Sequence, residues 1–230
     1  MTGTALEAAP PPSASRAAAA DAPLIFSAPM VRALTMGAKT ETRRLAAMKR
    51  AAAIRPGSLV WVREAFRLED GFDAAGPKVM ESTSFTEMPV WHEADCGAPD
   101  PKRTRSRWGR AFGRCRSPIH MPRWASRLTL RVIEARIEPL HAIDDAGAAA
   151  EGITRLPWDI AGAARYGAEL ERGAWTAVAP SPRESYALFW DELHGRSDGA
   201  RWGANPTVVV IRFEVIAKNI AAVLAAEFRR

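Results

Sequence analysis

A short basic and aromatic patch precedes one of the expected strands. His120, Arg123 and Trp124 fall within a single short run of the chain. A tryptophan can stack on an unpaired base while histidine and arginine side chains donate hydrogen bonds around it. The alternative is that Met121 and Trp124 belong to a hydrophobic core. We predict that His120, Arg123 and Trp124 bind nucleic acid, and the expected loop favours this role most for His120 and Arg123.

Histidine and cysteine side chains raise the question of a metal site. His92 and Cys96 are spaced H-x3-C, and Cys115 and His120 are spaced C-x4-H. Four such ligands can hold zinc in a tetrahedral site. A zinc motif is usually tighter than this, and neither cysteine has a second cysteine close by in the sequence. We therefore predict no metal site and no cofactor.

Asn205 is a further candidate for binding nucleic acid. It follows Trp202 and directly precedes Pro206. Its amide could bind a base edge, and ordinary turn chemistry is the competing explanation. Trp61, by contrast, alternates with apolar neighbours and is predicted to be core.

Composition favours a negatively charged partner. Of the 230 residues, 32 are lysine or arginine and 26 are aspartate or glutamate, which gives a formal net charge of +6. Arginine dominates the excess, and its planar, permanently charged fork suits phosphates and base edges. We predict RNA, single-stranded nucleic acid or a nucleoside as the partner.

The sequence has no feature of a secreted or membrane-spanning protein. The first residues lack an apolar signal region, and no run of about 18 apolar residues occurs. Two cysteines are too few for a disulfide scaffold. The predicted location is therefore cytoplasmic, with no membrane partner.

Composition also divides the chain. Residues 1–22 are rich in alanine, proline and serine and are predicted to be disordered. Residues 23–216 are predicted to form one domain, interrupted at about 69–117 by an insertion with little regular structure. Residues 217–230 form a C-terminal tail, for which an alanine-rich helix from Asn219 is predicted.

Strands alternate with short helices in the predicted domain. Strands are expected at 24–26, 59–62, 128–137 and 207–216, the last of them central because it is rich in β-branched residues. Helices are expected from Pro29 to Gly37, from Asp144 to Gly152 and from Ser181 to Gly195, where the ends carry typical caps. The last helix is expected to bury Leu188, Phe189 and Leu193. This pattern predicts an α+β fold rather than a doubly wound sheet.

Five sequence blocks resemble the ASCH superfamily. Residues 37–44, Gly-Ala-Lys-Thr-Glu-Thr-Arg-Arg, resemble its G-x-K-T-x-T-x-R loop. The other blocks follow in the family's order at 56–64, 143–153, 189–190 and 208–215. The run 117–127 is similar to ASCH proteins of proteobacterial phages and prophages. Together the blocks cover most of residues 23–216, apart from the insertion.

The resemblance implies a PUA-like small β-barrel with short flanking helices and a cleft that faces RNA or nucleotides. One branch of the superfamily removes the acetyl group from N4-acetylcytidine, and its motif places the catalytic residues at Lys39, Thr42 and Glu151. Arg43 and Arg44 would hold the ligand, because a guanidinium can pair with a phosphate or a base edge.

Three functions remain open. The first is a domain that binds RNA, a nucleotide or a modified nucleoside. The second is an amidohydrolase, in which Thr42 or a water attacks, Lys39 acts as base after its pKa is depressed, and Glu151 passes a proton to the leaving amine. The third is a phage or prophage accessory protein that binds another protein. The second requires Lys39, Thr42 and Glu151 to converge.

Overall fold

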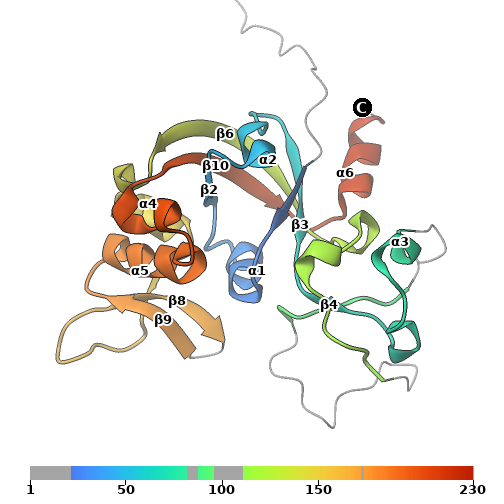
Figure 1. The fold of residues 1–230 in the computed structure, drawn as a ribbon, viewed down its shortest axis with the longest axis horizontal. Helices are drawn as coiled ribbons and strands as arrows, with labels where there is room; N and C mark the ends of the chain where they lie inside the picture. Colours follow the sequence, from blue (N-terminus) through green and yellow to red (C-terminus); the bar gives the residue numbers. More distant parts are fainter. Residues whose placement is uncertain (1–21, 82–87, 96–110, 172–173, 230) are drawn as a thin grey trace, which may run out of the picture.

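The computed structural model describes residues 22–81, 88–95, 111–171 and 174–229, and these form an α+β fold (Figure 1). The main sheet has five strands: β1 (Ala22–Ile25), β2 (Glu41–Leu45), β3 (Leu59–Arg63), β6 (Thr129–Pro139) and β10 (Thr207–Ile216). The predicted disordered segment 1–22 lies outside the described residues, except for Ala22, which opens β1.

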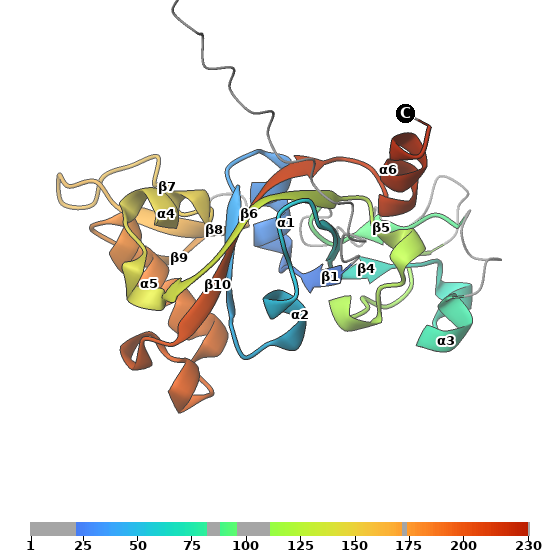
Figure 2. The ribbon, with the colours of Figure 1, turned by 90° about the horizontal axis from the view of Figure 1, so that it is seen from above.

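The order of the main sheet is β1-β3-β6-β10-β2. β1 runs parallel to β3, and the other pairs are antiparallel. The long strands β6 and β10 cross the molecule together (Figure 2). β10 lies between β6 and β2, so the prediction of a central strand at 207–216 is confirmed. Within the described residues, no pairing joins β1 to β2, and no closed barrel is detected.

Two short helices flank the sheet where their caps predicted them. α1 (Ala28–Thr35) has proline in its first turn and is followed by Gly37 at φ 74°. α4 (Asp145–Ala150) begins at Asp144, whose carboxylate accepts the Gly147 N–H at 2.7 Å. Local signals thus mark both helices: proline and glycine at the two ends of α1, and a side-chain cap at the start of α4.

A second, three-stranded sheet packs against the longest described helix, and that helix lies beside α4 (Figure 1). Its strands are β7 (Thr154–Arg155), β8 (Tyr166–Glu171) and β9 (Ala174–Ala179), in the order β7-β8-β9. The helix is α5 (Pro182–His194), and the Ser181 hydroxyl caps it by accepting the Glu184 N–H. The helix and its cap confirm the prediction, whereas the sequence had suggested no structure for this sheet.

The predicted buried face of α5 is largely wrong. Leu188 and Leu193 are 51% and 48% exposed, whereas Tyr186 and Trp190 are buried beside Phe189. The polar atoms of the two aromatic side chains find partners only on this inner face. The Trp190 indole N–H donates to the Ala200 carbonyl at 2.7 Å, and Tyr186 reaches Glu151. The orientation of α5 thus buries the aromatic rings that carry a polar group and leaves the aliphatic side chains of Leu188 and Leu193 exposed.

The described part of the predicted insertion contains short elements packed on a core of their own. These are β4 (Phe66–Arg67) at its border, η1 (Asp70–Phe72), α3 (Pro77–Met80) and β5 (Trp91–His92). The core joins Phe66, Leu68 and Met80 to Met121 and Ala125. It lies on the side of the molecule away from α5 (Figure 1). Local order here exceeds what the irregular sequence predicted.

The C-terminal helix is present as predicted. α6 (Ile220–Glu227) begins at Asn219, whose side chain accepts the Ala221 N–H at 2.8 Å. Ile220 and Val223 pack on Leu59 and Trp61, which is buried as expected. No helix among the described residues has the length and apolar character needed to cross a membrane.

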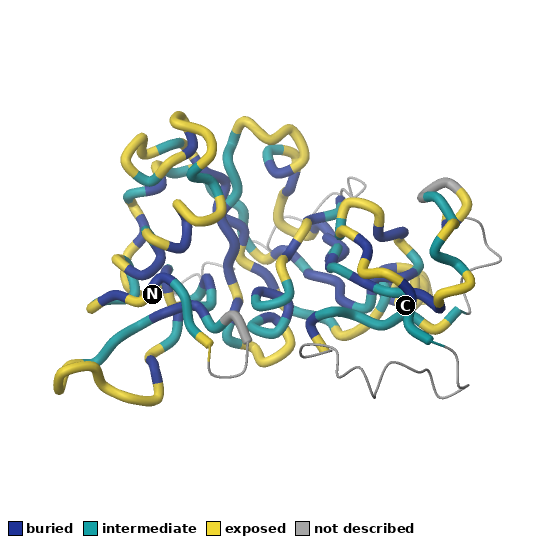
Figure 3. Tube along the Cα trace, turned by 60° about the horizontal axis from the view of Figure 1, so that its bottom comes forward, coloured by how far each residue is buried: buried dark blue, intermediate teal, exposed yellow. Residues whose placement is uncertain are grey.

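The remaining short elements shape the connections. They are α2 (Lys49–Ala52), η4 (Pro118–His120), η5 (Arg123–Ala125), η6 (Leu140–Ala142), η7 (Asp198–Ala200) and η8 (Trp202–Ala204). Buried residues concentrate along the main sheet and α1, and exposed ones at the outer turns (Figure 3).

Candidate functional site

The carboxylate of Glu151 is the centre of a buried polar cluster. Glu151 is the C-cap residue of α4. Its Oε2 accepts from Lys39 Nζ at 2.5 Å, and its Oε1 accepts from the Arg43 backbone N–H at 2.5 Å. The Tyr186 hydroxyl donates to Oε1 at 3.1 Å. The cluster therefore joins β2, α4 and α5 around one negative charge.

The edge of the main sheet explains why this carboxylate is placed there. β2 is an edge strand, so N–H groups on its outer side have no strand to pair with. The Arg43 N–H on that side donates to Glu151. The Thr40 N–H donates to the Ala150 carbonyl at 2.8 Å, one residue earlier on α4. The end of α4 thus supplies acceptors for two backbone N–H groups at the free edge of the sheet, those of Thr40 and Arg43.

Lys39 is fully buried against this carboxylate. Its Nζ donates to the Glu151 backbone carbonyl at 2.8 Å as well as to the side chain. Burial lowers the pKa of the Lys39 amine from 10.5, the attraction of Glu151 opposes this shift, and Arg44 and Arg43 add to it. A lysine with a lowered pKa is the form required for a general base.

Arg43 supports the cluster from the other side of β2. Its guanidinium lies 3.2 Å from Glu138, 3.5 Å from Glu41 and 3.5 Å from Glu151. The Arg43 side chain is only 2% exposed. Three carboxylates therefore engage the guanidinium that the motif had suggested for ligand binding, and the nearest of them is that of Glu138.

Thr42 and Arg44 lie on the opposite face of β2 from Arg43, as strand alternation requires. Thr42 is fully buried, and within the described residues its hydroxyl has no hydrogen-bond partner. Arg44 donates to the Ile25 carbonyl at 2.8 Å, and its guanidinium lies 4.9 Å from the centre of the Phe26 ring. Burial also lowers the pKa of Arg44. This face thus offers an unsatisfied hydroxyl and a partly buried cation.

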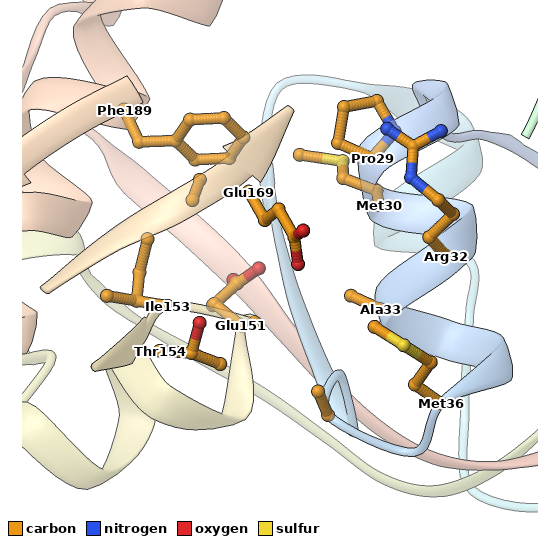
Figure 4. A pocket seen from close by; sticks show the side chains of 13 residues that line it. Pro29, Met30, Arg32, Ala33, Met36, Glu151, Ile153, Thr154, Glu169 and Phe189 are labelled. Atoms are coloured by element: carbon orange, nitrogen blue, oxygen red, sulfur yellow. The ribbon is translucent and has the colours of Figure 1, made fainter. Parts of the chain in front are cut away.

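A small pocket, with a cavity volume of about 40 Å³, reaches Glu151 from between α1 and β8. Figure 4 shows the side chains of Glu151 and Glu169 extending into the space between the elements, with Met30, Met36 and Phe189 around it. The wall formed by α1 also carries Arg32. The pocket therefore combines apolar walls with carboxylates and a guanidinium.

Tyr186 and Arg32 were not predicted as site residues. Tyr186 is one of only two tyrosines and lies four residues before Trp190, at helical spacing. That pair marks the inner face of α5 and was the available signal. Arg32 stands on α1 with no distinguishing motif, so nothing in the sequence singled it out.

The predicted patch at 120–124 lies apart from the Glu151 cluster. His120 is exposed at the end of η4, and Arg123 is exposed in η5. The Trp124 indole N–H donates to the Met80 carbonyl at 2.6 Å, and its ring packs on the core of the insertion. These residues and Lys39 do not line one pocket among those found between described residues.

Asn205 and the histidine and cysteine candidates have ordinary structural surroundings. Asn205 adopts a left-handed conformation at φ 46°, and its side chain accepts the His141 N–H at 2.8 Å. His92 Nε2 lies 3.0 Å from the Ala125 carbonyl, and Cys115 is exposed. Cys96 is outside the described residues, and no group of three potential metal ligands occurs within them.

Removal of the Tyr186 hydroxyl tests its place in the cluster. Tyr186→Phe should lower the free energy of unfolding by about 1.5 kcal/mol, because a buried hydrogen bond to a charged group is lost while other donors to Glu151 remain. Burial and Glu151 raise the pKa of Tyr186 well above 10. Its hydroxyl thus stabilises the fold fully below about pH 10, and this contribution is lost as the pH rises towards the higher folded pKa. Urea unfolding should show a steeper decline above pH 10 for the wild type than for Tyr186→Phe; equal slopes would contradict this assignment.

Gly152 tests how tightly the cluster packs on α1. Its φ is 102°, and a Cβ there would lie 3.3 Å from the Ala33 Cβ and 3.6 Å from the Lys39 Cβ. Gly152→Ala should therefore lose about 1–2 kcal/mol of stability through backbone strain and crowding. Gly57→Ala is the control, because Gly57 has φ 85° and nothing within 4 Å of its Cβ position. Equal losses in urea unfolding would show that crowding against α1 contributes nothing.

Comparison with known proteins adds no relative to this picture, since no protein-family model, curated protein or solved structure matches the chain.

Proposed function

We propose that the chain is an ASCH-type domain of the PUA-like class, and that it binds a nucleoside, or a nucleotide of RNA, beside Glu151. The five-stranded sheet would correspond to the barrel of that class. The observation that carries the proposal is the contact of Lys39 Nζ with Glu151 Oε2 at 2.5 Å, which joins residues from two separate motifs. Thr42 is adjacent to Arg43 on β2 but lies on the opposite face of the strand, where its buried hydroxyl has no hydrogen-bond partner within the described residues.

The lining of the pocket beside Glu151 suits a flat, partly polar ligand, for which the small cavity would have to widen between α1 and β8. Met30, Met36 and Phe189 supply apolar surface, while the carboxylates of Glu151 and Glu169 and the guanidinium of Arg32 supply polar groups. Pockets of this kind use a few polar groups to orient a ligand that is otherwise held by apolar contact. A nucleobase has a planar ring and hydrogen-bonding edges, so its chemistry matches both parts of the pocket.

Hydrolysis of an acyl amide on the bound base is a second candidate, and the buried Lys39–Glu151 pair favours it. The Thr42 hydroxyl, or a water, would attack the acyl carbon while neutral Lys39 takes its proton. The proton would pass through the Lys39–Glu151 pair to the leaving amine as the C–N bond breaks. With water as nucleophile the products are a carboxylic acid and the free base amine; with Thr42, a water then hydrolyses the ester. Because burial lowers the Lys39 pKa, the rate should rise with pH below 10.5.

The test is a panel of nucleosides and N-acylated nucleosides, including N4-acetylcytidine, offered to the full-length protein. Binding is measured by calorimetry and deacylation by chromatography. Lys39→Met should abolish both, whereas Lys49→Met, the same change at an exposed site on α2, should retain them. Binding without turnover supports the first function alone. Absence of binding and turnover across the panel, with the wild type folded, would refute both.

A further inference from the structure

A second pocket opens between β3, η5 and the start of α6, beside the core of the insertion. It is an open groove whose principal side chains are Trp61, Arg63, Glu81, Arg123, Trp124 and Asn219. Within the described residues, no hydrogen bond or ion pair joins any of these side chains to Lys39 or Glu151. The groove is therefore separate from the site proposed above.

Two guanidinium groups give the groove its positive charge. The guanidinium of Arg63 lies 4.6 Å from the centre of the Trp61 ring, and Arg123 lies across the same groove. Within the described residues, the buried Arg63 Nε has no hydrogen-bond partner. Arg50 adds a nearby like charge, whereas Glu81, which also lines the groove, opposes it. An anion bound in the groove would offset the repulsion between Arg63 and Arg50.

The aromatic wall of the groove is held in place. The indole N–H of Trp124 donates to the Met80 carbonyl at 2.6 Å, which fixes the ring while it remains half-buried. The Asn219 side-chain amide contacts the carbonyls of Arg123 at 2.9 Å and Ser126 at 2.7 Å. This links η5 to α6, so the aromatic and cationic groups are positioned before any ligand arrives.

We propose that this groove binds single-stranded RNA, with a phosphate held between Arg63 and Arg123 and a base stacked on Trp124. Paired guanidinium groups beside a fixed aromatic ring are the features by which proteins hold single strands. An acidic peptide would share the charge complementarity but would gain nothing from an aromatic stacking surface. The proposal goes beyond the nucleoside site at Glu151 and does not depend on it.

The experiment measures fluorescence anisotropy of a labelled single-stranded RNA of about ten nucleotides. Titrations with the full-length protein are run between about 50 and 200 mM salt. The double variant Arg63→Gln/Arg123→Gln should bind about tenfold more weakly or worse, with a salt slope shallower by about 2. The matched control Arg155→Gln/Arg201→Gln removes two exposed arginines elsewhere and should behave as the wild type.

Further variants separate the two sites. Trp124→Leu should weaken binding about fivefold or more without changing the salt slope. The Arg63/Arg123 double variant should retain nucleoside binding at Glu151, so that failure of the groove and failure of the site at Glu151 can be told apart. Equal RNA affinity for the two double variants would overturn the groove as an RNA site. The proposal would also be overturned if polyglutamate displaced the labelled RNA at the same concentration as unlabelled RNA does. That result would instead indicate an acidic protein partner.

Discussion

Replacing Glu151 with alanine is expected to lower the free energy of unfolding by about 3–5 kcal/mol. The change leaves the fully buried Lys39 amine with only one acceptor, the backbone carbonyl of residue 151. It also removes the acceptor of the Arg43 backbone N–H and of the Tyr186 hydroxyl. Buried donors without partners each carry a desolvation cost, so the losses accumulate at one position. Urea unfolding measures the effect.

Glu138→Ala is the matched control for this change. Glu138 also contacts Arg43, at 3.2 Å, but its side chain is 18% exposed, against 4% for Glu151. Its loss should cost at most about 1 kcal/mol. Glu151→Gln should fall between the two variants, because the amide keeps one carbonyl acceptor of similar size. A loss for Glu151→Ala no larger than that for Glu138→Ala would show that the cluster does not stabilise the fold.

Local signals in the sequence were sufficient for most elements of the main sheet and its helices. Asp144 and Ser181 cap α4 and α5, and Gly37 and Gly152 follow helices with positive φ values. Such signals depend on a few adjacent residues, so they can be recognised without tertiary information. The β-branched run of β10 predicted its central position for the same reason.

The sequence predictions failed where contacts with residues distant in the chain determine the structure. The polar groups of Tyr186 and Trp190 set the inner face of α5, and their acceptors come from Glu151 and Ala200. Apolar spacing alone favoured Leu188, which is exposed. The β8–β9 hairpin was missed because no strong alternation or common turn pair marks it in the sequence.

The candidate site shows the same division. The motif identified Lys39 and Glu151, which form a contact across 112 positions of the chain. It did not indicate that Glu151 also satisfies the free edge of β2 through the Arg43 N–H. That second contact explains why a carboxylate at this position is needed for the sheet as well as for any chemistry. Loss of function on changing Glu151 would therefore not by itself identify a catalytic role.

Lys39 separates structure from chemistry better than Glu151 does. Lys39→Met removes one donor to the carboxylate, while the Arg43 N–H and guanidinium and the Tyr186 hydroxyl remain. The remaining charge is thus still partly compensated. We expect a loss of about 2–4 kcal/mol, smaller than for Glu151→Ala, together with complete loss of nucleoside binding.

A double-mutant cycle measures the coupling directly. Lys39→Met/Glu151→Gln should be less destabilised than the sum of its single variants, by about 1–3 kcal/mol, since each single change leaves part of the other group unsatisfied. The cycle is read by urea unfolding, with Lys49→Met/Glu151→Gln as the pair that should be additive, because Lys49 lies exposed on α2. Additivity within about 0.5 kcal/mol for Lys39 and Glu151 would mean that the 2.5 Å contact is not an interacting ion pair in solution. In that case Glu151 would not oppose the lowering of the Lys39 pKa. Burial alone would then support a role for Lys39 as a base.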